Sequence, residues 1–444
     1  MKLRSLVFRV VIGLLASRTA WAVTGPDAAA ASLAGEWVLT TTIFGSVAGE
    51  RLKLSVDQGK ITGSIYQRKD VPLTGTVEGD RIRFEVKDQD GSTSAYDGRM
   101  KDGLLSGTVT FSGEPWGATP PSTWRARRAA VDKPAAPRTL DFEPKEFHRV
   151  FSSTIEPVLR IWPGDTVRTR TVDAGGVDEN AKSRSLGGNP QTGPFYVEGA
   201  MPGDVLVVHV RKLRLNRPTA ISDDGFVDRA LTTDYASEHK DNVFNDVIWN
   251  LDLEQGLARP AKPTDHLKDL AVPVRPMLGC VGVAPGFGSA AVRTGDSGRF
   301  GGNMDFNEIR EGAAVYLPVS QPGALLYVGD GHALQGDGEL NGNALETSLD
   351  VEFSVDLVRE KSLAGPRVEN ADFLMAMGLG GSLDEAFREA TSGLASWLES
   401  EYGLTGPEAA ILLGATVEYK ISEVADRNAG VVAKINRKFL PPKP

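Results

Sequence analysis

Residues 325–339 have the sequence LLYVGDGHALQGDGE, in which an apolar run leads directly into a loop rich in glycine and charged groups. The apolar half has the length and composition of a buried β-strand. The loop carries four side chains that can bind a metal ion or transfer a proton, namely Asp330, His332, Asp337 and Glu339. Glycines between them let the backbone approach a ligand closely. The stretch therefore predicts a β-rich fold with a functional loop at the end of a buried strand.

The spacing of these side chains predicts how they pair. In extended backbone, residues i and i+2 point to the same side, so Asp330 converges with His332, and Asp337 with Glu339. A carboxylate beside an imidazole can hold a divalent ion or perform general acid–base catalysis. A Gly-Asp-Gly turn would account for any one aspartate. Four such groups within ten residues, including one of the five histidines of the chain, favour a functional site instead.

Two further segments combine glycine with polar side chains. Residues 301–305, GGNMD, have a glycine pair that permits close approach, followed by Asn303 and Asp305 at i and i+2. Residues 189–200, NPQTGPFYVEGA, carry Glu198 at the end of an expected strand. A glycine-rich turn and a surface strand end are the alternatives for these two segments.

The region of residues 33–128 is expected to form a separate, accessory β domain. Apolar and polar residues alternate along it, as at Leu52, Leu54 and Val56, and turn signals separate the runs. A period of two buries one side of each strand, which predicts a small antiparallel barrel or sandwich. The region has no histidine or cysteine and no acidic cluster with ligand spacing. A linker rich in proline and alanine follows at residues 129–137.

The region of residues 138–444 predicts longer strands followed by helices. Pro-Gly-Asp occurs at residues 163–165 and 202–204, each before an apolar run, which indicates tight turns with glycine at positive φ. Ser382–Glu385 and Thr405–Glu408 are capping boxes, and Gly403 ends the first helix. One face of that helix carries Ala386, Ala390, Leu394, Trp397 and Leu398. The fold class is therefore mostly β, a β-rich α+β protein with helices near the C-terminus.

The N-terminus has the three parts of a secretory signal peptide. Lys2 and Arg4 precede a short apolar run at residues 10–16, and Ala20-Trp21-Ala22 is a small-x-small cleavage site. The run is too short to anchor the chain stably in a bilayer. We expect residues 1–22 to be removed and the protein to be periplasmic or secreted.

Charge and cysteine usage exclude some classes of protein. The formal net charge of −9 argues against a nucleic-acid partner, which requires a basic face. Cys280 is the one cysteine of the chain, so no intrachain disulfide can form. These features fit a soluble enzyme, with a homo-oligomer as a further possibility.

Five segments, in order, resemble the acetamidase/formamidase family. They are Phe151–Ser153 with Pro163–Val167, Gly193–Asp204, Met277–Pro285, Gly301–Asp305, and Gly329–Ala333 running on to Gln335–Glu339. Each segment alone is a weak signal, but five in the same order are a strong one. The resemblance covers about residues 145–440 and leaves the N-terminal β domain outside it.

The resemblance implies a largely β catalytic domain that hydrolyses short amides such as formamide and acetamide to a carboxylate and ammonia. Amide hydrolysis requires stabilisation of the carbonyl oxygen, activation of water and protonation of the leaving amine. A divalent metal ion, zinc or alternatively calcium, could meet the first two needs. We expect Asp330, His332 and Asp305 to bind it and Asn303 and Gly302 to bind substrate. The residues that could move protons are His332, Asp337, Glu339 and Glu198.

Two alternatives stay open at this point. Cys280 could be a nucleophile, although it lies in an apolar run where a buried thiol is usually inert. The chain could instead be a secreted binding protein that uses its N-terminal β domain to recognise a small molecule. The position of Asp330 and His332 relative to Asn303 and Asp305 would separate an enzyme from a binding protein.

Overall fold

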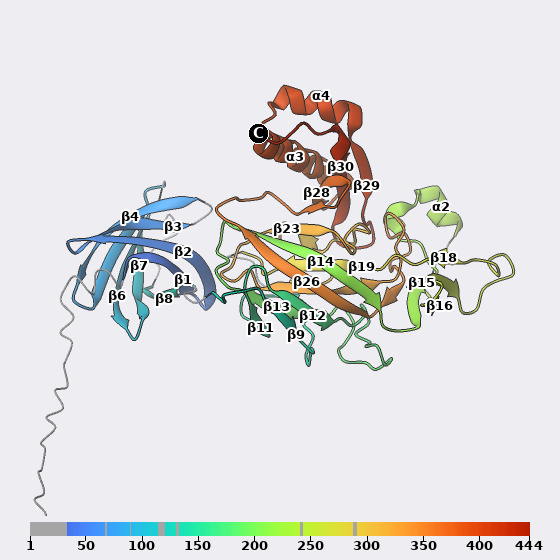
Figure 1. The fold of residues 1–444 in the computed structure, drawn as a ribbon, viewed down its shortest axis with the longest axis horizontal. Helices are drawn as coiled ribbons and strands as arrows, with labels where there is room; N and C mark the ends of the chain where they lie inside the picture. The colour runs from blue at the N-terminus through green and yellow to red at the C-terminus, as the bar shows by residue number, and fades with distance from the viewer. Residues whose placement is uncertain are drawn as a thin grey trace, which may run out of the picture.

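The computed structural model describes residues 33–66, 69–88, 90–113, 120–129, 133–239, 243–286 and 291–444. It has an N-terminal barrel beside a larger region of two sheets, with helices above the second sheet (Figure 1). Strands dominate both regions, which confirms the prediction of a mostly β fold. The expected signal peptide lies outside the described residues.

The N-terminal strands form a closed antiparallel barrel in which each strand pairs with the next and β8 pairs with β1. Its strands are β1 (Gly35–Ile43), β2 (Ser46–Asp57), β3 (Lys60–Tyr66), β4 (Asp70–Glu78), β5 (Arg81–Lys87), β6 (Thr93–Lys101), β7 (Leu104–Ser112) and β8 (Ser122–Arg128). Alternate residues such as Leu52 and Leu54 point into an apolar interior. Closure into a barrel leaves no free strand edge in this sheet.

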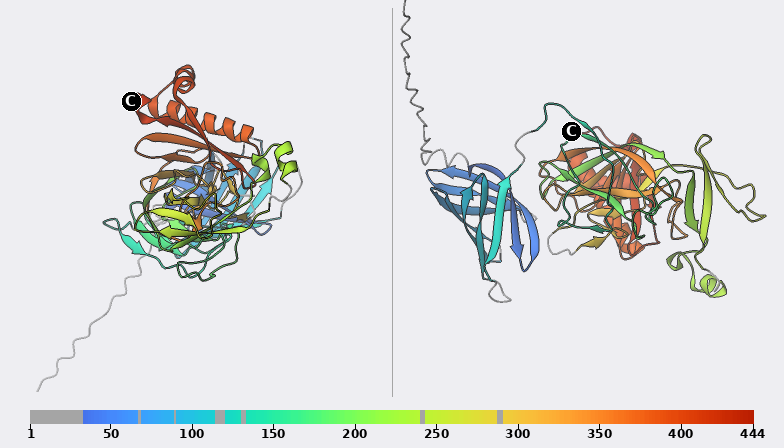
Figure 2. Two further views of the ribbon diagram at one scale, coloured as in Figure 1. Left: turned by 90° about the vertical axis from the view of Figure 1, so that its right-hand side faces the viewer. Right: turned by 90° about the horizontal axis from the view of Figure 1, so that it is seen from below.

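The second region contains two large sheets, which Figure 2 shows apart from the barrel. The first comprises β11 (Leu159–Ile161), β13 (Gln191–Val197), β15 (Thr219–Asp223), β16 (Asp246–Asp252), β17 (Leu257–Pro260), β18 (Val272–Pro273), β19 (Met277–Val283), β21 (Ser297–Gly298), β22 (Gly301–Asn303), β24 (Leu326–His332) and β25 (Glu346–Thr347). The second comprises β9 (Thr139–Asp141), β12 (Thr166–Arg170), β14 (Val205–Leu215), β23 (Ala314–Pro318), β26 (Leu349–Val358), β27 (Arg367–Glu369), β28 (Phe373–Gly380), β29 (Glu418–Ile421) and β30 (Ala429–Asn436). Two short strands, β10 (Val150–Phe151) and β20 (Val292–Arg293), pair with each other as a separate antiparallel sheet.

One apolar core joins the two sheets. Val281 of β19 in the first sheet, and Val315 of β23 and Phe353 of β26 in the second, belong to the same buried cluster. The strands of this core carry near-continuous apolar runs, because both of their faces are covered. The rigid sheets therefore fix the positions of the loops at the strand ends.

The C-terminal helices begin and end where the capping signals indicate. The first is α3 (Leu383–Tyr402), where the Ser382 hydroxyl accepts a hydrogen bond from the Glu385 N–H at 3.2 Å, and Gly403 ends it with φ 69°. Its apolar face packs on β28 and β30. The other helical segments are α4 (Gly406–Thr416), α2 (Thr233–Glu238), η1 (Asp228–Ala230) and η2 (Arg437–Phe439).

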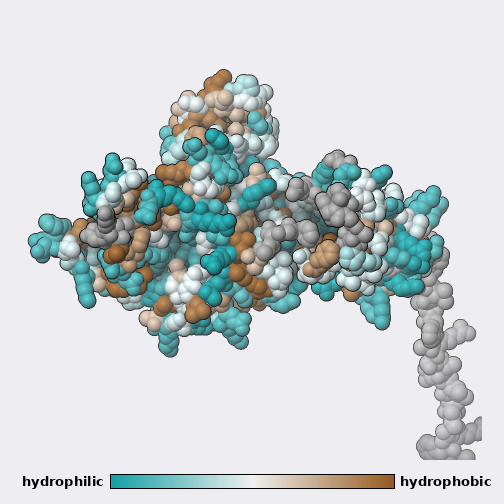
Figure 3. All heavy atoms as spheres, turned by 180° about the vertical axis from the view of Figure 1, so that it is seen from behind, coloured by the Kyte–Doolittle hydropathy of each residue, from teal (hydrophilic) through white to brown (hydrophobic). Residues whose placement is uncertain are grey.

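The outer surface of the helical unit is partly apolar. Figure 3 shows apolar residues at the far end of this unit. Ile411 of α4 is 76% exposed. Among the described residues, no helix is long and apolar enough to cross a membrane.

The two Pro-Gly-Asp segments form the expected turns. Gly164 and Gly203 have φ of 97° and 89°, and the Asp204 N–H donates to the Met201 carbonyl at 3.0 Å. Only glycine adopts this backbone conformation without steric cost. The strand that follows each turn is β12 or β14, as predicted.

The second of these turns is the place where the barrel docks. Asp204 is fully buried and forms an ion pair with Arg51 of β2, which is 2% exposed. The Tyr66 ring of the barrel lies so close to Gly203 that a side chain there would overlap it. Arg127 of β8 donates to the Tyr196 hydroxyl of β13. The barrel is thus held by specific buried polar contacts as well as by its linker.

Candidate functional site

A cluster of acidic and imidazole side chains lies in the first sheet, where β19, β22, β24 and β25 meet. Asp330 and His332 are on β24, and Glu346 lies directly opposite His332 on β25. Asp305 follows β22, and Glu339 comes from the loop between β24 and β25. Each of these five residues is 6% exposed or less. Buried charged groups are costly unless they are paired or bind an ion, so the cluster is not an ordinary part of a core.

The imidazole of His332 lies at the centre of the cluster. Its Nε2 is 3.1 Å from a Glu346 carboxylate oxygen, 3.3 Å from Asp330 Oδ1 and 3.9 Å from Asp305 Oδ1. Two overlapping groups offer one ligand atom per residue, with all atoms of a group within 4.8 Å of one another: Asp330, His332 and Glu346, and Asp305, His332 and Glu339. Both groups therefore have the spacing of donors around one small ion.

The second nitrogen of His332 is oriented by Gln335. The Gln335 amide nitrogen donates to the backbone carbonyls of Asp305, at 2.6 Å, and Ser422, at 3.0 Å. This fixes the side-chain oxygen of Gln335 as the atom 3.0 Å from His332 Nδ1, so Nδ1 carries the proton and donates. In a neutral imidazole the Nε2 lone pair then points at carboxylate oxygens, a repulsive arrangement unless a proton or a cation lies between them.

Several polar atoms of the cluster have no hydrogen-bond partner among the described residues. They are Asp305 Oδ1, Asp330 Oδ1, His332 Nε2 and Glu346 Oε2. The free space in front of them depends on Gly279 of β19. A Cβ at this position would overlap carboxylate oxygens of Asp305 and Asp330 and lie 2.9 Å from the His332 ring. Glycine here keeps open a small space lined by potential ligands.

Carboxamides form a second layer around the acidic groups. The Asn189 side-chain N–H₂ donates to Asp330 Oδ2 at 3.1 Å and to the side-chain oxygen of Asn303. The Asn303 N–H₂ donates to Asp305 and Asp426, each at 2.6 Å. These bonds fix the orientation of the carboxylates and leave their remaining oxygens directed into the cluster.

The electrostatics of the cluster indicate an excess of negative charge. Burial raises the pKa of Asp305 well above its usual range, and Glu339 and Asp330 add to this shift. Burial also raises the pKa of Glu346 to about 7, although His332 opposes the change. For His332, burial acts to lower the pKa, but the carboxylates of Glu346 and Asp330 raise it well above its usual value. Bound protons or a cation must therefore balance these groups.

The loop between β29 and β30 covers the exposed side of the cluster. Asp426 of this loop reaches Asn303, and the Asn428 N–H₂ donates to the Ser297 carbonyl at 2.6 Å. Burial, with a contribution from Asp426, raises the pKa of Glu423 to about 8. Asp426 is only partly buried, so this loop is where the cluster approaches solvent.

Comparison with known proteins agrees with the fold. Residues 286–436 match the Acetamidase/Formamidase family. A formamidase from Methylophilus methylotrophus is 23% identical over 363 residues, which cover 65% of this chain and 88% of the relative. A crystal structure of a recombinant predicted acetamidase/formamidase from Thermoanaerobacter tengcongensis has a TM-score of 0.58 and 28% identity, over 68% of this chain and 97% of that chain. The crystal structure of acetamidase from Yersinia enterocolitica has a TM-score of 0.59 and 28% identity, over 69% of this chain and 94% of that chain.

The chain is similar to the acetamidase/formamidase family in sequence and in fold. This similarity supports an amide hydrolase. The closed N-terminal barrel is consistent with the expected β domain outside the family resemblance.

The structure brings most of the expected site residues of this acetamidase/formamidase-like chain together. Asp330 and His332 converge as their spacing indicates, and Asn303 contacts Asp305. Glu339 also lies in the cluster, where it accepts a hydrogen bond from the Ala344 N–H at 2.9 Å. Gly302 precedes Asn303 in β22, with φ 92° and tight packing against the Phe300 ring.

Asp337 and Glu198 are not part of the cluster. Asp337 is half-exposed and bonds to Asn307 at 2.7 Å and Lys420 at 3.2 Å. Its expected pairing with Glu339 is wrong, because Gly338 and Glu339 have φ of 88° and 47° and the backbone there is not extended. Glu198 pairs with Arg160 at 2.6 Å, at the other end of β13 from the strand's contact with the cluster.

Sequence reasoning missed several residues that complete the site. They are Glu346, Gly279, Asn189, Gln335 and Asp426. Glu346 becomes a neighbour of His332 only through strand pairing, which no local pattern reveals. Gln335 is three residues from His332 in the same loop, so its closeness to the imidazole is a local signal.

Cys280 lies next to the cluster in sequence but has a different environment. Its thiol packs with Phe151 and Tyr327 and is 3.8 Å from the Thr294 carbonyl oxygen. Burial raises its pKa well above the usual value, and the nearby carboxylates of Asp330 and Asp305 add to this. Such a thiol is protonated and inert, so the structure lends no support to a cysteine nucleophile.

Proposed function

We propose that this protein hydrolyses the C–N bond of a short linear amide, giving a carboxylate and ammonia with the assistance of a divalent metal ion. The observation that carries the proposal is the unpaired Nε2 of His332, which faces carboxylate oxygens while Nδ1 donates to Gln335. A metal-binding histidine commonly donates its other ring N–H to a fixed acceptor in this way. The combination of that orientation with three nearby carboxylates favours a metal centre over a simple buried ion pair.

The donor set fits zinc, with calcium as the alternative. His332, Asp330 and Glu346, together with Asp305, would hold the ion. Imidazole nitrogen with carboxylate oxygens is a usual zinc set, whereas calcium prefers ligands that are all oxygen. A bound divalent ion would polarise the amide carbonyl and lower the pKa of a bound water.

The chain itself would supply proton transfer and substrate orientation. One oxygen of Glu339 is held by the Ala344 N–H, which leaves the other able to take a proton from water and deliver it to the leaving amine. The N–H₂ groups of Asn189 and Asn303 keep the carboxylates in place. The side-chain oxygen of Gln191 has no partner among the described residues and could accept from a substrate N–H₂.

The burial of the site limits the size of the substrate. Its five central residues are almost completely inaccessible, and the free space at Gly279 is small. A formamide- or acetamide-sized molecule fits such a site better than a peptide. We further propose that the protein acts outside the cytoplasm, on the basis of the signal-peptide pattern of residues 1–22.

An ammonia-release screen tests the proposed activity. Purified full-length protein would be assayed with formamide, acetamide, propionamide and benzamide, with heat-denatured protein as the control. We expect release of ammonia from the smallest amides and a steep fall in kcat/KM as the acyl group grows. Absence of ammonia release from every amide in metal-supplemented buffer would refute an amidase function.

A further inference from the structure

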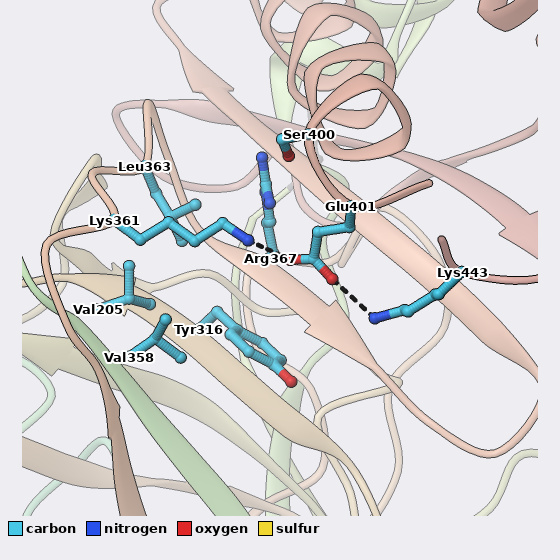
Figure 4. A pocket seen from close by; sticks show the side chains of 9 residues that line it. All are labelled: Val205, Tyr316, Val358, Lys361, Leu363, Arg367, Ser400, Glu401 and Lys443. Carbon is cyan, nitrogen blue, oxygen red and sulfur yellow. Dashed lines mark hydrogen bonds and ion pairs between the residues drawn. The ribbon is translucent and has the colours of Figure 1, made fainter. Parts of the chain in front are cut away.

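A second cleft lies on the opposite sheet from the acidic cluster, below helix α3. Its volume is about 410 Å³, a size typical of sites for small organic ligands. Residues from β14, β23, β26, β27, α3, the segment between β26 and β27, and the C-terminus line it, and Figure 4 shows their side chains. None of these lining residues belongs to the acidic cluster.

The cleft is rich in positive charge. Lys361, Arg367 and Lys443 line it, and Glu401 is its one acidic lining residue. Figure 4 shows Lys361 and Lys443 reaching Glu401 from different sides, at 3.0 and 2.9 Å. Although burial works against it, hydrogen bonds from Lys443 and Lys361 lower the pKa of Glu401 to about 2. Glu401 is thus ionised and satisfied by the two lysines, and the lining keeps an excess of positive charge.

Arg367 is the unusual residue of the cleft. It is only 8% exposed, yet among the described residues its guanidinium forms no hydrogen bond or close ion pair. It stacks over the Trp397 ring at 4.8 Å, and Glu401 acts on its charge only over a longer distance. Burial lowers its pKa to about 10, although Glu401 and Tyr316 oppose the change, so Arg367 remains charged at neutral pH. Burying a charge without a partner is costly, and a cation beside an open cleft is typical of an anion-binding site.

The remaining walls are apolar and indicate what kind of anion would fit. Val205, Val358 and Leu363 line the cleft, and Figure 4 shows Val205 and Val358 on the side away from Ser400. An inorganic phosphate would leave these aliphatic side chains uncovered, and a dianion would be repelled more strongly by Glu401. A carboxylate matches the planar fork of an arginine and carries an apolar body.

We propose that this cleft binds a small organic carboxylate, with its anionic group on Arg367 and its apolar body against Val205, Val358 and Leu363. The site is independent of the proposed amide hydrolysis. Val205 follows Asp204 and Lys361 follows Glu360, the residues that contact Arg51 of the barrel. The barrel therefore contacts residues next to the cleft lining, and the test uses the full chain so that these contacts are kept.

Titration calorimetry and thermal unfolding test this site, with sodium butyrate as the probe and sodium phosphate and sodium chloride at equal ionic strength as comparisons. We expect saturable butyrate binding and a rise in Tm that grows with the logarithm of its concentration. Arg367→Met keeps the apolar stem but removes the charge, and should weaken binding by about tenfold or more. Because the guanidinium is buried and unpaired, the free variant should melt no lower than the wild type.

The control variant is Lys438→Gln, which removes an exposed lysine outside the cleft and should bind butyrate like the wild type. If Arg367→Met does not fold, Arg367→Lys replaces it; lysine keeps the charge but lacks the planar fork, so butyrate binding should again weaken. Unchanged butyrate affinity in the cleft variant would overturn the proposal. So would tighter binding of phosphate than of butyrate, or an effect of butyrate no larger than that of chloride.

Discussion

The barrel and the acidic cluster are built from similar antiparallel strands but use their interiors in opposite ways. The barrel fills its interior with apolar side chains such as Trp37, Leu52 and Phe84. The cluster buries carboxylates and an imidazole whose atoms lack partners among the described residues. The barrel interior is thus an ordinary hydrophobic core, whereas the buried charges of the cluster require bound protons or a cation. This difference argues for catalysis in the second region and against a ligand site inside the barrel.

Backbone conformation shows the same contrast. In the barrel, the non-glycine residues with positive φ are Phe44, Gln58 and Asp102, all exposed at hairpin turns. In the second region, four such residues are buried in the site: Asn189, Asp305, Asp330 and Glu339, with φ between 40° and 59°. Unfavourable backbone conformations persist where the surrounding structure and the function require them.

The largest expected effect is on activity when the centre of the cluster is removed. His332→Ala deletes the shared member of both groups of potential ligands. We expect kcat/KM for the best amide to fall by about 100-fold or more, with little loss of secondary structure. Ammonia release, with circular dichroism as the folding control, measures this. If His332→Ala keeps most of its activity, the cluster is not the catalytic site, and the proposed difference between the two regions is wrong.

Cys280→Ser is the matched control for that experiment. The thiol is buried against Phe151 and Tyr327, so serine should leave kcat/KM within about threefold of the wild type. Loss of activity in Cys280→Ser at unchanged Tm, with an active His332→Ala, would instead make the cysteine the nucleophile.

The next effect concerns the barrel, where a change should alter stability but not turnover. Arg51→Met breaks a buried ion pair, but Asp204 retains Arg359 at 3.0 Å and two backbone donors. We expect destabilisation of about 1–3 kcal/mol and unchanged kcat/KM. Lys53→Met, which breaks an exposed pair with Glu360, should cost under about 1 kcal/mol. A large fall in kcat/KM at full folding would mean that the barrel takes part in catalysis.

Removing the whole barrel tests directly whether it contributes to turnover. A chain that begins near Pro137 lacks β1–β8 but retains every residue of the cluster. We expect it to turn over a small amide at the rate of the full chain. Normal folding with complete loss of activity would contradict an accessory role.

The last effect is a pH dependence of stability that originates at Glu423, in the loop between β29 and β30. Burial raises the folded-state pKa of Glu423 to about 8, above its usual 4.5, so the folded protein holds a proton that the unfolded chain releases. This stabilisation is present at acidic pH and is lost as pH rises from about 5 to 8. Glu423→Gln should flatten the change in unfolding free energy over this window by at least about 1 kcal/mol. Equal pH profiles for variant and wild type would contradict the assignment.

Local sequence patterns were sufficient to predict the strands and helices and part of the candidate site. The period of two in Leu52 and Leu54, and the capping box at Ser382, depend on neighbouring residues only, and the structure confirms both. The convergence of Asp330 and His332 within one strand is equally local. Closure of the barrel could not be told from a sandwich, because it depends on the pairing of β1 with β8.

The rest of the site depends on contacts between distant residues. Glu346 faces His332 through strand pairing, and Gly279 is informative only because Asp305 and Asp330 surround it. Asp337 illustrates the opposite error, since a positive φ at Glu339 turns the two carboxylates apart. Asp330 also has a positive φ, 58°, yet still converges with His332, so spacing alone does not decide which side chains meet in such a segment.

Metal content measured together with activity tests the central claim most directly. The full chain would be analysed by mass spectrometry for bound metals, dialysed against a chelator, and assayed for ammonia release before and after zinc or calcium is restored. We predict that activity falls by about 100-fold or more on metal removal and returns in proportion to the divalent ion bound per chain. Metal-free protein that releases ammonia at the full rate would contradict the account.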